Sequence, residues 1–324
     1  MMGSFVRLAV LAVGLLCLGA SIASAAYPDK PIHIVVPYTP GGTVDLLARA
    51  MAPLLTEGWG QQIVVENRPG AGGSVGAEYV AQAAADGYTL LLSTNSPLTT
   101  NVVLFKTIKY DPLRDFAPVI LAGQDALVLA VNLDLPVKSA ADLIALAKQQ
   151  PGKLIGASSG NGTTSHLSLT TFNKMAGVDI THVPYAGGVP SLTAVISGEA
   201  QLVFSDIVPA LPMINDGRLR ALATTGLSRS GVAPNVPTLN ESGLKGFDLA
   251  AWVAMVAPKD TPQDVVAKLN ARIAEILKQP EFRQYIIKIG IDPIGDTPEE
   301  FGKYLAAQIP VWRERALDAG LKVE

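Results

Sequence analysis

Short apolar runs alternate with stretches of helical periodicity along most of the chain. The run at residues 32–36 (IHIVV) predicts a buried strand, and residues 37–42 (PYTPGG) predict a turn. Helical periodicity then begins near Thr43, with apolar residues from Val44 to Leu55 on one stripe. Because proline lacks a backbone N–H, Pro53 predicts a kink in this helix or an early end to it.

The same alternation continues beyond this first unit. Ser74 is a candidate cap for a helix to Ala84, and Ser139 for a helix to Gln149. The further predicted strands are 63–65, 88–92, 154–155, 178–183, 202–204, 219–224 and 249–256. The further predicted helices are 163–175, 188–196, 208–214 and most of 261–321, with breaks at Pro280 and at Asp292-Pro293. Strands that alternate with helices predict an α/β fold with parallel pairing and right-handed crossovers.

The N-terminal segment has the pattern of a secretory signal peptide. Arg7 precedes an apolar run of about 11 residues, which is short of the roughly 20 that a membrane-spanning helix needs. The run is followed by Ala23-Ser24-Ala25, an A-x-A cleavage pattern. We therefore expect residues 1–25 to be removed on export. The alternative interpretation of the segment is an N-terminal membrane anchor.

Composition excludes several classes of function. The 324 residues carry a formal charge of −3, which argues against a nucleic-acid partner because phosphate binding needs an excess of basic residues. The single cysteine, Cys17, lies in the predicted leader, so the mature chain would have no disulfide and no cysteine-ligated metal. The three histidines are not at metal-ligand spacing. We therefore expect no metal and no cofactor.

Two loops between a strand and a helix are built alike. Residues 37–43 and 156–163 each place glycines and hydroxyls where a predicted helix begins. Free backbone N–H groups and the positive end of the helix dipole meet there, so each loop can bind an anion. If the two loops face each other, they form a clamp for an anionic ligand.

One motif suggests an enzyme instead. Residues 156–160 (GASSG) match G-x-S-x-G, the nucleophile motif of α/β-hydrolases, with Ser158 as nucleophile. Only His166 and His182 follow it, and Asp179 is three residues before His182 on one short predicted strand, where alternation turns the two side chains apart. An HGGG oxyanion loop is absent from the sequence. An exported serine hydrolase remains the alternative hypothesis, and no catalytic residue is assigned.

Several strings together resemble the Bug family, the extracytoplasmic solute receptors of tripartite tricarboxylate transporters. The strings are YPDKP (27–31), VVPY (35–38) with Gly41, Gly42 and Asp45, VENRPGAGG (65–73), DGYTLL (86–91), GNGT (160–163) before His166, AGVDITHVPY (176–185), GRLRALA (217–223) and PEEF (298–301). They cover essentially the whole expected mature chain.

The resemblance implies a two-lobed periplasmic binding protein fold of type II, with two crossovers between lobes. Each lobe would be a mostly parallel sheet flanked by helices, with residues 26–125 and 250–324 in lobe 1 and residues 126–249 in lobe 2. The implied function is capture of a small organic carboxylate in the periplasm, without catalysis, and its delivery to integral membrane transporter subunits. A receptor that serves a sensory partner is an alternative. We expect a monomer.

The same resemblance implies the ligand-binding residues. Carried over by position, they are Tyr38, Thr39, Gly41, Gly42, Thr43, Asp45, Ser158, Ser159, Thr163, His166, Ser205 and Asp206. His166 would either contact the ligand or cap its helix, and Asp45 could simply complement the helix dipole.

Three positions depart from the family pattern. Val44 replaces a common threonine, Ala186 replaces a common basic residue, and Ser205 stands where relatives often carry aspartate. We expect Ser205 to lie just past its strand and to face the ligand, where a serine suits a neutral or second anionic group better than an ammonium. An alternative is that Ser205 only satisfies a helix N-terminus.

Overall fold

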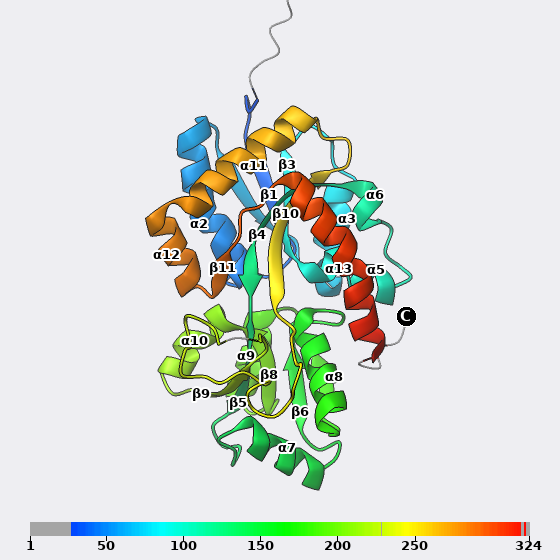
Figure 1. The fold of residues 1–324 in the computed structure, drawn as a ribbon, viewed down its shortest axis with the longest axis vertical. Coiled ribbons are helices and arrows are strands. Elements are labelled where there is room, and N and C mark those ends of the chain that lie inside the picture. Colours follow the sequence, from blue (N-terminus) through cyan, green and yellow to red (C-terminus); the bar gives the residue numbers. More distant parts are fainter. Residues whose placement is uncertain (1–26, 228, 319–320, 322–324) are drawn as a thin grey trace, which may run out of the picture.

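The chain folds into two α/β lobes, one above the other in Figure 1. The computed structural model describes residues 27–227, 229–318 and 321, so the predicted leader at 1–25 lies outside the described residues. Within these ranges, no helix combines the length and the apolar composition needed to cross a bilayer.

The upper lobe, lobe 1, is built on a sheet with the strand order β11-β4-β10-β3-β1-β2. Its strands are β1 (Ile32–Val36), β2 (Ile63–Asn67), β3 (Thr89–Thr94), β4 (Phe116–Asp125), β10 (Ala251–Pro258) and β11 (Ile291–Pro293). The lower lobe, lobe 2, has the order β7-β6-β8-β5-β9. Its strands are β5 (Leu127–Asn132), β6 (Ile155–Ser158), β7 (Thr181–Pro184), β8 (Leu202–Asp206) and β9 (Leu219–Thr224).

Both sheets are mixed, and in each of them a strand that follows a crossover breaks the parallel pattern; in lobe 1 the short edge strand β11 also runs antiparallel to its neighbour β4. The chain passes from β4 directly into β5, which is antiparallel to β8 and β9. It returns after β9 into β10, which is antiparallel to β3 and β4. A strand that enters from the other lobe begins at the end of the sheet where the neighbouring strands finish. It therefore runs antiparallel to them. The strands β4 and β10 therefore lie side by side at the waist of the molecule (Figure 1).

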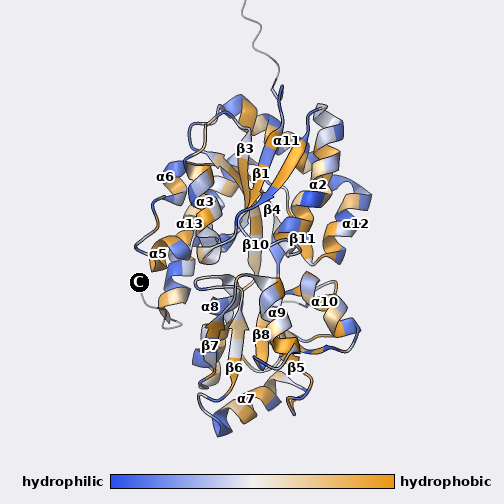
Figure 2. Ribbon diagram, turned by 180° about the vertical axis from the view of Figure 1, so that it is seen from behind, coloured by the Kyte–Doolittle hydropathy of each residue, from blue (hydrophilic) through white to orange (hydrophobic). Residues whose placement is uncertain are grey.

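Helices cover both faces of each sheet. In lobe 1 they are α2 (Thr43–Trp59), η2 (Ala71–Gly73), α3 (Ser74–Ala81), α4 (Asn95–Leu98), α5 (Asn101–Leu104), α6 (Pro112–Asp115), α11 (Gln263–Lys278), α12 (Pro280–Lys288) and α13 (Pro298–Asp318). In lobe 2 they are α7 (Ala140–Gln149), α8 (Thr164–Ala176), α9 (Gly188–Ile196) and α10 (Ile207–Asn215). The strands are largely hydrophobic, and the helices around them carry both hydrophilic and hydrophobic residues (Figure 2).

Most predicted elements are present, and several of their boundaries differ; β6, for example, runs to Ser158, which the prediction placed in the following loop. Helix α2 continues through Pro53 to Trp59, so the proline does not shorten it. Ser74 is the first residue of α3 rather than its cap, and α3 ends at Ala81. The strand β8 runs through Ser205 to Asp206, two residues beyond the predicted end at Phe204. The strands β4 and β5, which carry the first crossover, were not predicted from the sequence.

The C-terminal helix α13 spans the two lobes. Near its start, Phe301 and Leu305 pack into the core of lobe 1 with the buried Trp252. Near its end, Trp312 and Ala316 join the buried cluster of lobe 2. The last turns of the tail, expected in lobe 1, therefore pack against lobe 2 beside α8 (Figure 1).

Candidate functional site

A small cavity lies where the two lobes meet. It leaves about 40 Å³ for the centres of water molecules, which is room for roughly three waters. The residues that line it are Tyr38, Thr39, Gly42, Thr43, Val44, Thr94, Ser96 and Ala251 from lobe 1, and Ser159, Thr163, Thr164, Ser165, Gly188 and Asp206 from lobe 2. Hydroxyl groups dominate this lining, and Asp206 is its only charged residue.

The lobe 1 wall of the cavity is the start of α2. Gly42 is the N-cap residue and has no side chain that could accept a capping hydrogen bond from the first amides of α2. Thr43 and Val44, which carry two of these amides, line the cavity. An anion in the cavity would meet N–H donors and the positive end of the helix dipole.

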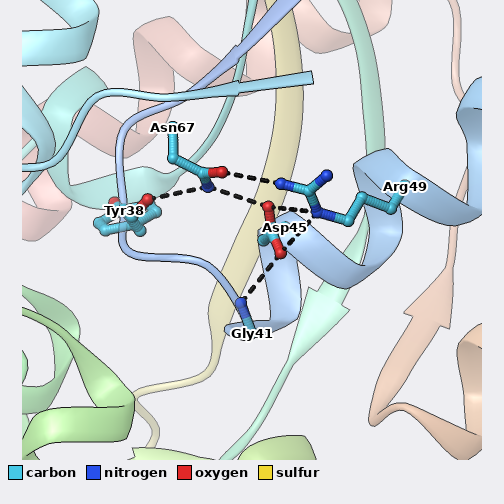
Figure 3. A network of polar contacts seen from close by, with 5 residues as sticks. All are labelled: Tyr38, Gly41, Asp45, Arg49 and Asn67. Carbon is cyan, nitrogen blue, oxygen red and sulfur yellow. Dashed lines mark hydrogen bonds and ion pairs between the residues drawn. The ribbon is translucent and has the colours of Figure 1, made fainter. Parts of the chain in front are cut away.

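Asp45 holds the loop before α2 in place and does not line the cavity. Its carboxylate accepts hydrogen bonds from the Gly41 N–H at 2.9 Å, from Asn67 Nδ2 at 2.9 Å and from Arg49 Nε at 3.0 Å (Figure 3). Asn67 also donates to the Tyr38 carbonyl oxygen. Burial works to raise the pKa of Asp45, but the hydrogen bonds from Arg49, Gly41 and Asn67 outweigh it and hold that pKa below its ordinary value.

A second helix N-terminus without a side-chain cap faces the cavity from lobe 2. Helix α9 begins at Gly188 after the N-cap Gly187, which provides no side-chain hydrogen bond. The two loops approach closely across the lobes: a methyl group added to Gly187 would lie 2.5 Å from Thr39 Oγ1. This terminus was not expected from the sequence, although a Gly-Gly pair stands at the start of α9 (Gly187-Gly188) much as Gly41-Gly42 stands before α2.

The N-terminus of α8, expected to bind an anion, is largely capped within the protein. The Thr163 hydroxyl accepts from the His166 N–H, and Ser96 Oγ of lobe 1 accepts from the Thr164 N–H at 3.0 Å. Thr164 Oγ1 also donates to Asn95 Oδ1 at 3.1 Å. These groups are buried and join opposite lobes, so the structure shows the lobes closed on each other. In this closed arrangement α8 supplies hydroxyls, while α2 and α9 offer their amides.

Ser158 lies close to a histidine, as a hydrolase would require. Its hydroxyl oxygen is 2.6 Å from His182 Nε2, a contact that the sequence analysis did not expect. However, Ser158 is fully buried, also receives the Gly160 N–H, and is absent from the cavity lining. Among the described residues, no carboxylate forms a hydrogen bond with His182 to orient it. The pair is therefore part of the packing of this loop.

His166 and His182 stack on each other with ring centroids 3.7 Å apart. The His166 Nδ1 accepts the Gly162 N–H at 3.2 Å, so this histidine braces the loop and does not line the cavity. Burial lowers the pKa of His166 to about 3, with the neighbouring His182 adding to the effect, and burial lowers the pKa of His182 to about 4. Both rings are neutral at pH 7.

This neutral stack predicts a pH-dependent contribution to stability. A histidine with a lower pKa in the folded state than in the unfolded chain, here about 4 against 6.5, stabilises the fold above pH 6.5 and loses that effect as the pH falls towards 4. We expect His182→Gln to melt below the parent at pH 7.5 and the difference to shrink at pH 5. Thermal denaturation of both proteins at pH 7.5 and pH 5 measures this difference in melting temperature. A difference that stays constant would contradict the neutral, buried imidazole.

Ser205 and Asp206 occupy other positions relative to the strand end than the sequence predicts. Because β8 continues to Asp206, Ser205 lies inside the strand opposite Val128, is 2% exposed, and does not line the cavity. Asp206 is the residue at the strand end, and it lines the cavity from the N-cap position of α10 without forming a capping bond.

The expected site residues thus divide into two groups. Those that line the cavity are Tyr38, Thr39, Gly42, Thr43, Ser159, Thr163 and Asp206. Those outside the lining are Gly41, Asp45, Ser158, His166 and Ser205. Thr94 and Ser96 also line the cavity but were not expected, although a polar, hydroxyl-rich stretch after a strand is a usual sign of a site at a sheet edge.

A larger groove adjoins the cavity and shares Tyr38 and Ser159 with it. It leaves about 300 Å³ for the centres of water molecules and is lined mostly by glycine, proline and small apolar residues from both lobes. None of its lining residues is charged, and Ala186 is among them. The body of a ligand too long for the cavity would extend into this groove.

Comparison with known proteins identifies close relatives. The sequence profile of the "Tripartite tricarboxylate transporter family receptor" matches residues 47–317. Protein BugT of Bordetella pertussis is 35% identical, over 95% of this chain and 94% of its own. An R. palustris structure described "with adipate" is 38% identical, with a TM-score of 0.89, over 91% of this chain and 99% of that one. MatC from Rhodopseudomonas palustris "with bound malate" is 32% identical, with a TM-score of 0.84, over 89% and 99%.

Proposed function

This chain belongs to the tripartite tricarboxylate transporter receptor family, and on that premise we propose that it captures a small organic carboxylate between its lobes and delivers it to a membrane transporter. The family consists of solute-binding receptors rather than enzymes. Capture would take place in the periplasm, with the chain acting as a monomer beside the integral membrane subunits. Lobe 1 would comprise residues 26–125 and 250–324, and lobe 2 residues 126–249.

The observation that carries this proposal is the pair of helix N-termini at the cavity. Helices α2 and α9 come from different lobes, each begins after a glycine without a side-chain cap, and both reach the cavity lining. A carboxylate between them would accept N–H hydrogen bonds from both lobes and would thereby favour closure. Two related structures, described with adipate and with malate, support a carboxylate as the ligand.

A thermal-shift screen of the mature protein against carboxylic acids tests the proposal. A ligand at 100 times its dissociation constant adds roughly 2.7 kcal/mol to the free energy of unfolding, which is an easily measured shift. The screen should include aliphatic and aromatic acids, diacids, hydroxy acids and amino acids, with the matching alcohols as controls. If no acid raises the melting temperature more than its alcohol, the proposed function is wrong.

Because the donors are backbone amides, nearby arginines should matter little for affinity. Arg49 is half exposed and contacts Asp45 and Asn67, while Arg68 contacts Glu66 and stacks on Tyr79. Neither lines the cavity. We expect Arg49→Ala and Arg68→Ala to change the dissociation constant by less than about tenfold, roughly 1.4 kcal/mol. Calorimetric titration with the best acid of the screen measures this, and a thousandfold loss in a folded variant would show that a guanidinium binds the ligand.

A further inference from the structure

Asp206 places one acidic group inside a cavity that otherwise offers hydroxyls and amides. The cavity lining contains no lysine, arginine or histidine that could neutralise it. The carboxylate of Asp206 forms no capping bond with α10. Because the cavity has room for only about three waters, any carboxylate bound there lies close to Asp206.

The groups around Asp206 leave it as the main carrier of negative charge at the site. Asp125, at the end of β4, is 2% exposed, and its Oδ1 has no hydrogen-bond partner. Burial, reinforced by the neighbouring Asp206, raises the pKa of Asp125 well above its ordinary value, which favours the neutral form of Asp125. Burial raises the pKa of Asp206 to about 6, which leaves it mostly ionised at pH 7.5. Tyr38 is the other titratable group that faces Asp206, and Asp292 faces Asp125 from β11.

A ligand with only a carboxylate would therefore bring a second negative charge into an enclosed, weakly screened space. A ligand that also carries an ammonium group would neutralise Asp206 while its carboxylate meets the amides of α2 and α9. We propose that Asp206 is the specificity-determining residue of this cleft and that it selects zwitterionic ligands, the α-amino acids, over carboxylic acids without an ammonium group. This inference rests on the proposed function and names its substrate class.

Matched ligand pairs test the inference. The mature protein is titrated in a calorimeter with the common amino acids and, for each, the acid that lacks the amino group: leucine with 4-methylpentanoate, phenylalanine with 3-phenylpropanoate, glutamate with glutarate. We expect the best amino acid to bind at least about 30-fold more tightly than its partner, because leaving one charge of a buried pair unmatched is costly. In Asp206→Asn, which preserves shape, the ratio should fall below about threefold.

The pH dependence of amino-acid affinity provides an independent test with the same two proteins. Between pH 7.5 and pH 5, Asp206 takes up a proton, so amino-acid affinity should fall in the parent and stay nearly constant in Asp206→Asn. The inference is overturned if the deaminated acid binds as tightly as its amino acid, or if the preference survives in Asp206→Asn. It is also overturned if only deaminated acids bind. If neither kind binds but another acid of the thermal-shift screen does, the inference is overturned and the proposed function stands; if no acid of the screen binds, the proposed function itself fails.

Discussion

Replacing Asp45 with alanine is expected to weaken carboxylate binding by about a hundredfold, roughly 2.7 kcal/mol, although Asp45 does not line the cavity. Its carboxylate is almost fully buried and accepts hydrogen bonds from the Gly41 N–H, Asn67 and Arg49 (Figure 3). Alanine leaves these donors unpaired, and the loop that aims the first amides of α2 loses its anchor. Calorimetric titration with the best acid of the screen measures the loss.

Two further variants separate the role of Asp45 from a general loss of stability. Asp86→Ala removes an exposed aspartate of the same lobe, which pairs with Lys30 at 3.0 Å, and should leave affinity unchanged. Asp45→Asn keeps one acceptor oxygen but loses the charge, so its affinity should lie between those of the parent and Asp45→Ala. If folded Asp45→Ala binds as well as the parent, the loop does not need this anchor.

The second large effect is expected from Gly72→Ala, which should obstruct closure and weaken binding at least tenfold. A Cβ atom at Gly72 would lie 2.5 Å from the carbonyl oxygen of Asn161, which belongs to the opposite lobe, whereas ordinary contacts begin at 3.4 Å. The backbone oxygen of Asn161 cannot rotate away as a side chain would. The lobes would have to stay apart, and the amides of α2 and α9 could not reach one ligand together.

The control for this prediction is Gly177→Ala, at the end of α8. Gly72 and Gly177 both have φ of 62°, so alanine introduces the same backbone strain at each, but a methyl at Gly177 meets nothing within 4 Å. With saturating ligand, small-angle scattering should show a larger radius of gyration for Gly72→Ala than for Gly177→Ala. Equal radii and equal affinities would show that this contact does not limit closure.

The elements that could be predicted from the sequence are those with a local signal. The strand β1 is a continuous apolar run, and Ser139 caps α7 with its hydroxyl, as its position before the helix indicates. The strands β4 and β5 were not predicted. The partner of β4 is β10, and their pairing joins residues more than a hundred positions apart in the sequence. Local periodicity carries little information about such partners.

The site was predictable in outline and less so in detail. Both anion-binding loops were expected from glycines and hydroxyls before a helix, yet α8 is capped by Ser96 from the other lobe, a contact that no local pattern reveals. The end of β8 differs from the prediction by two residues, so of the two expected residues Ser205 lies inside the strand and Asp206 lines the cavity. The expectation of a neutral or second anionic ligand group rested on Ser205, whereas the residue that lines the cavity carries a charge.

The most direct measurement of the central claim is a crystal structure of the mature protein with the tightest-binding acid of the screen. The account predicts that the ligand carboxylate lies between the lobes, with its oxygens within hydrogen-bond distance of backbone amides at the starts of α2 and α9, and with no lysine or arginine in contact. A carboxylate held by a basic side chain, or bound outside the cavity lined by Gly42 and Gly188, would contradict it.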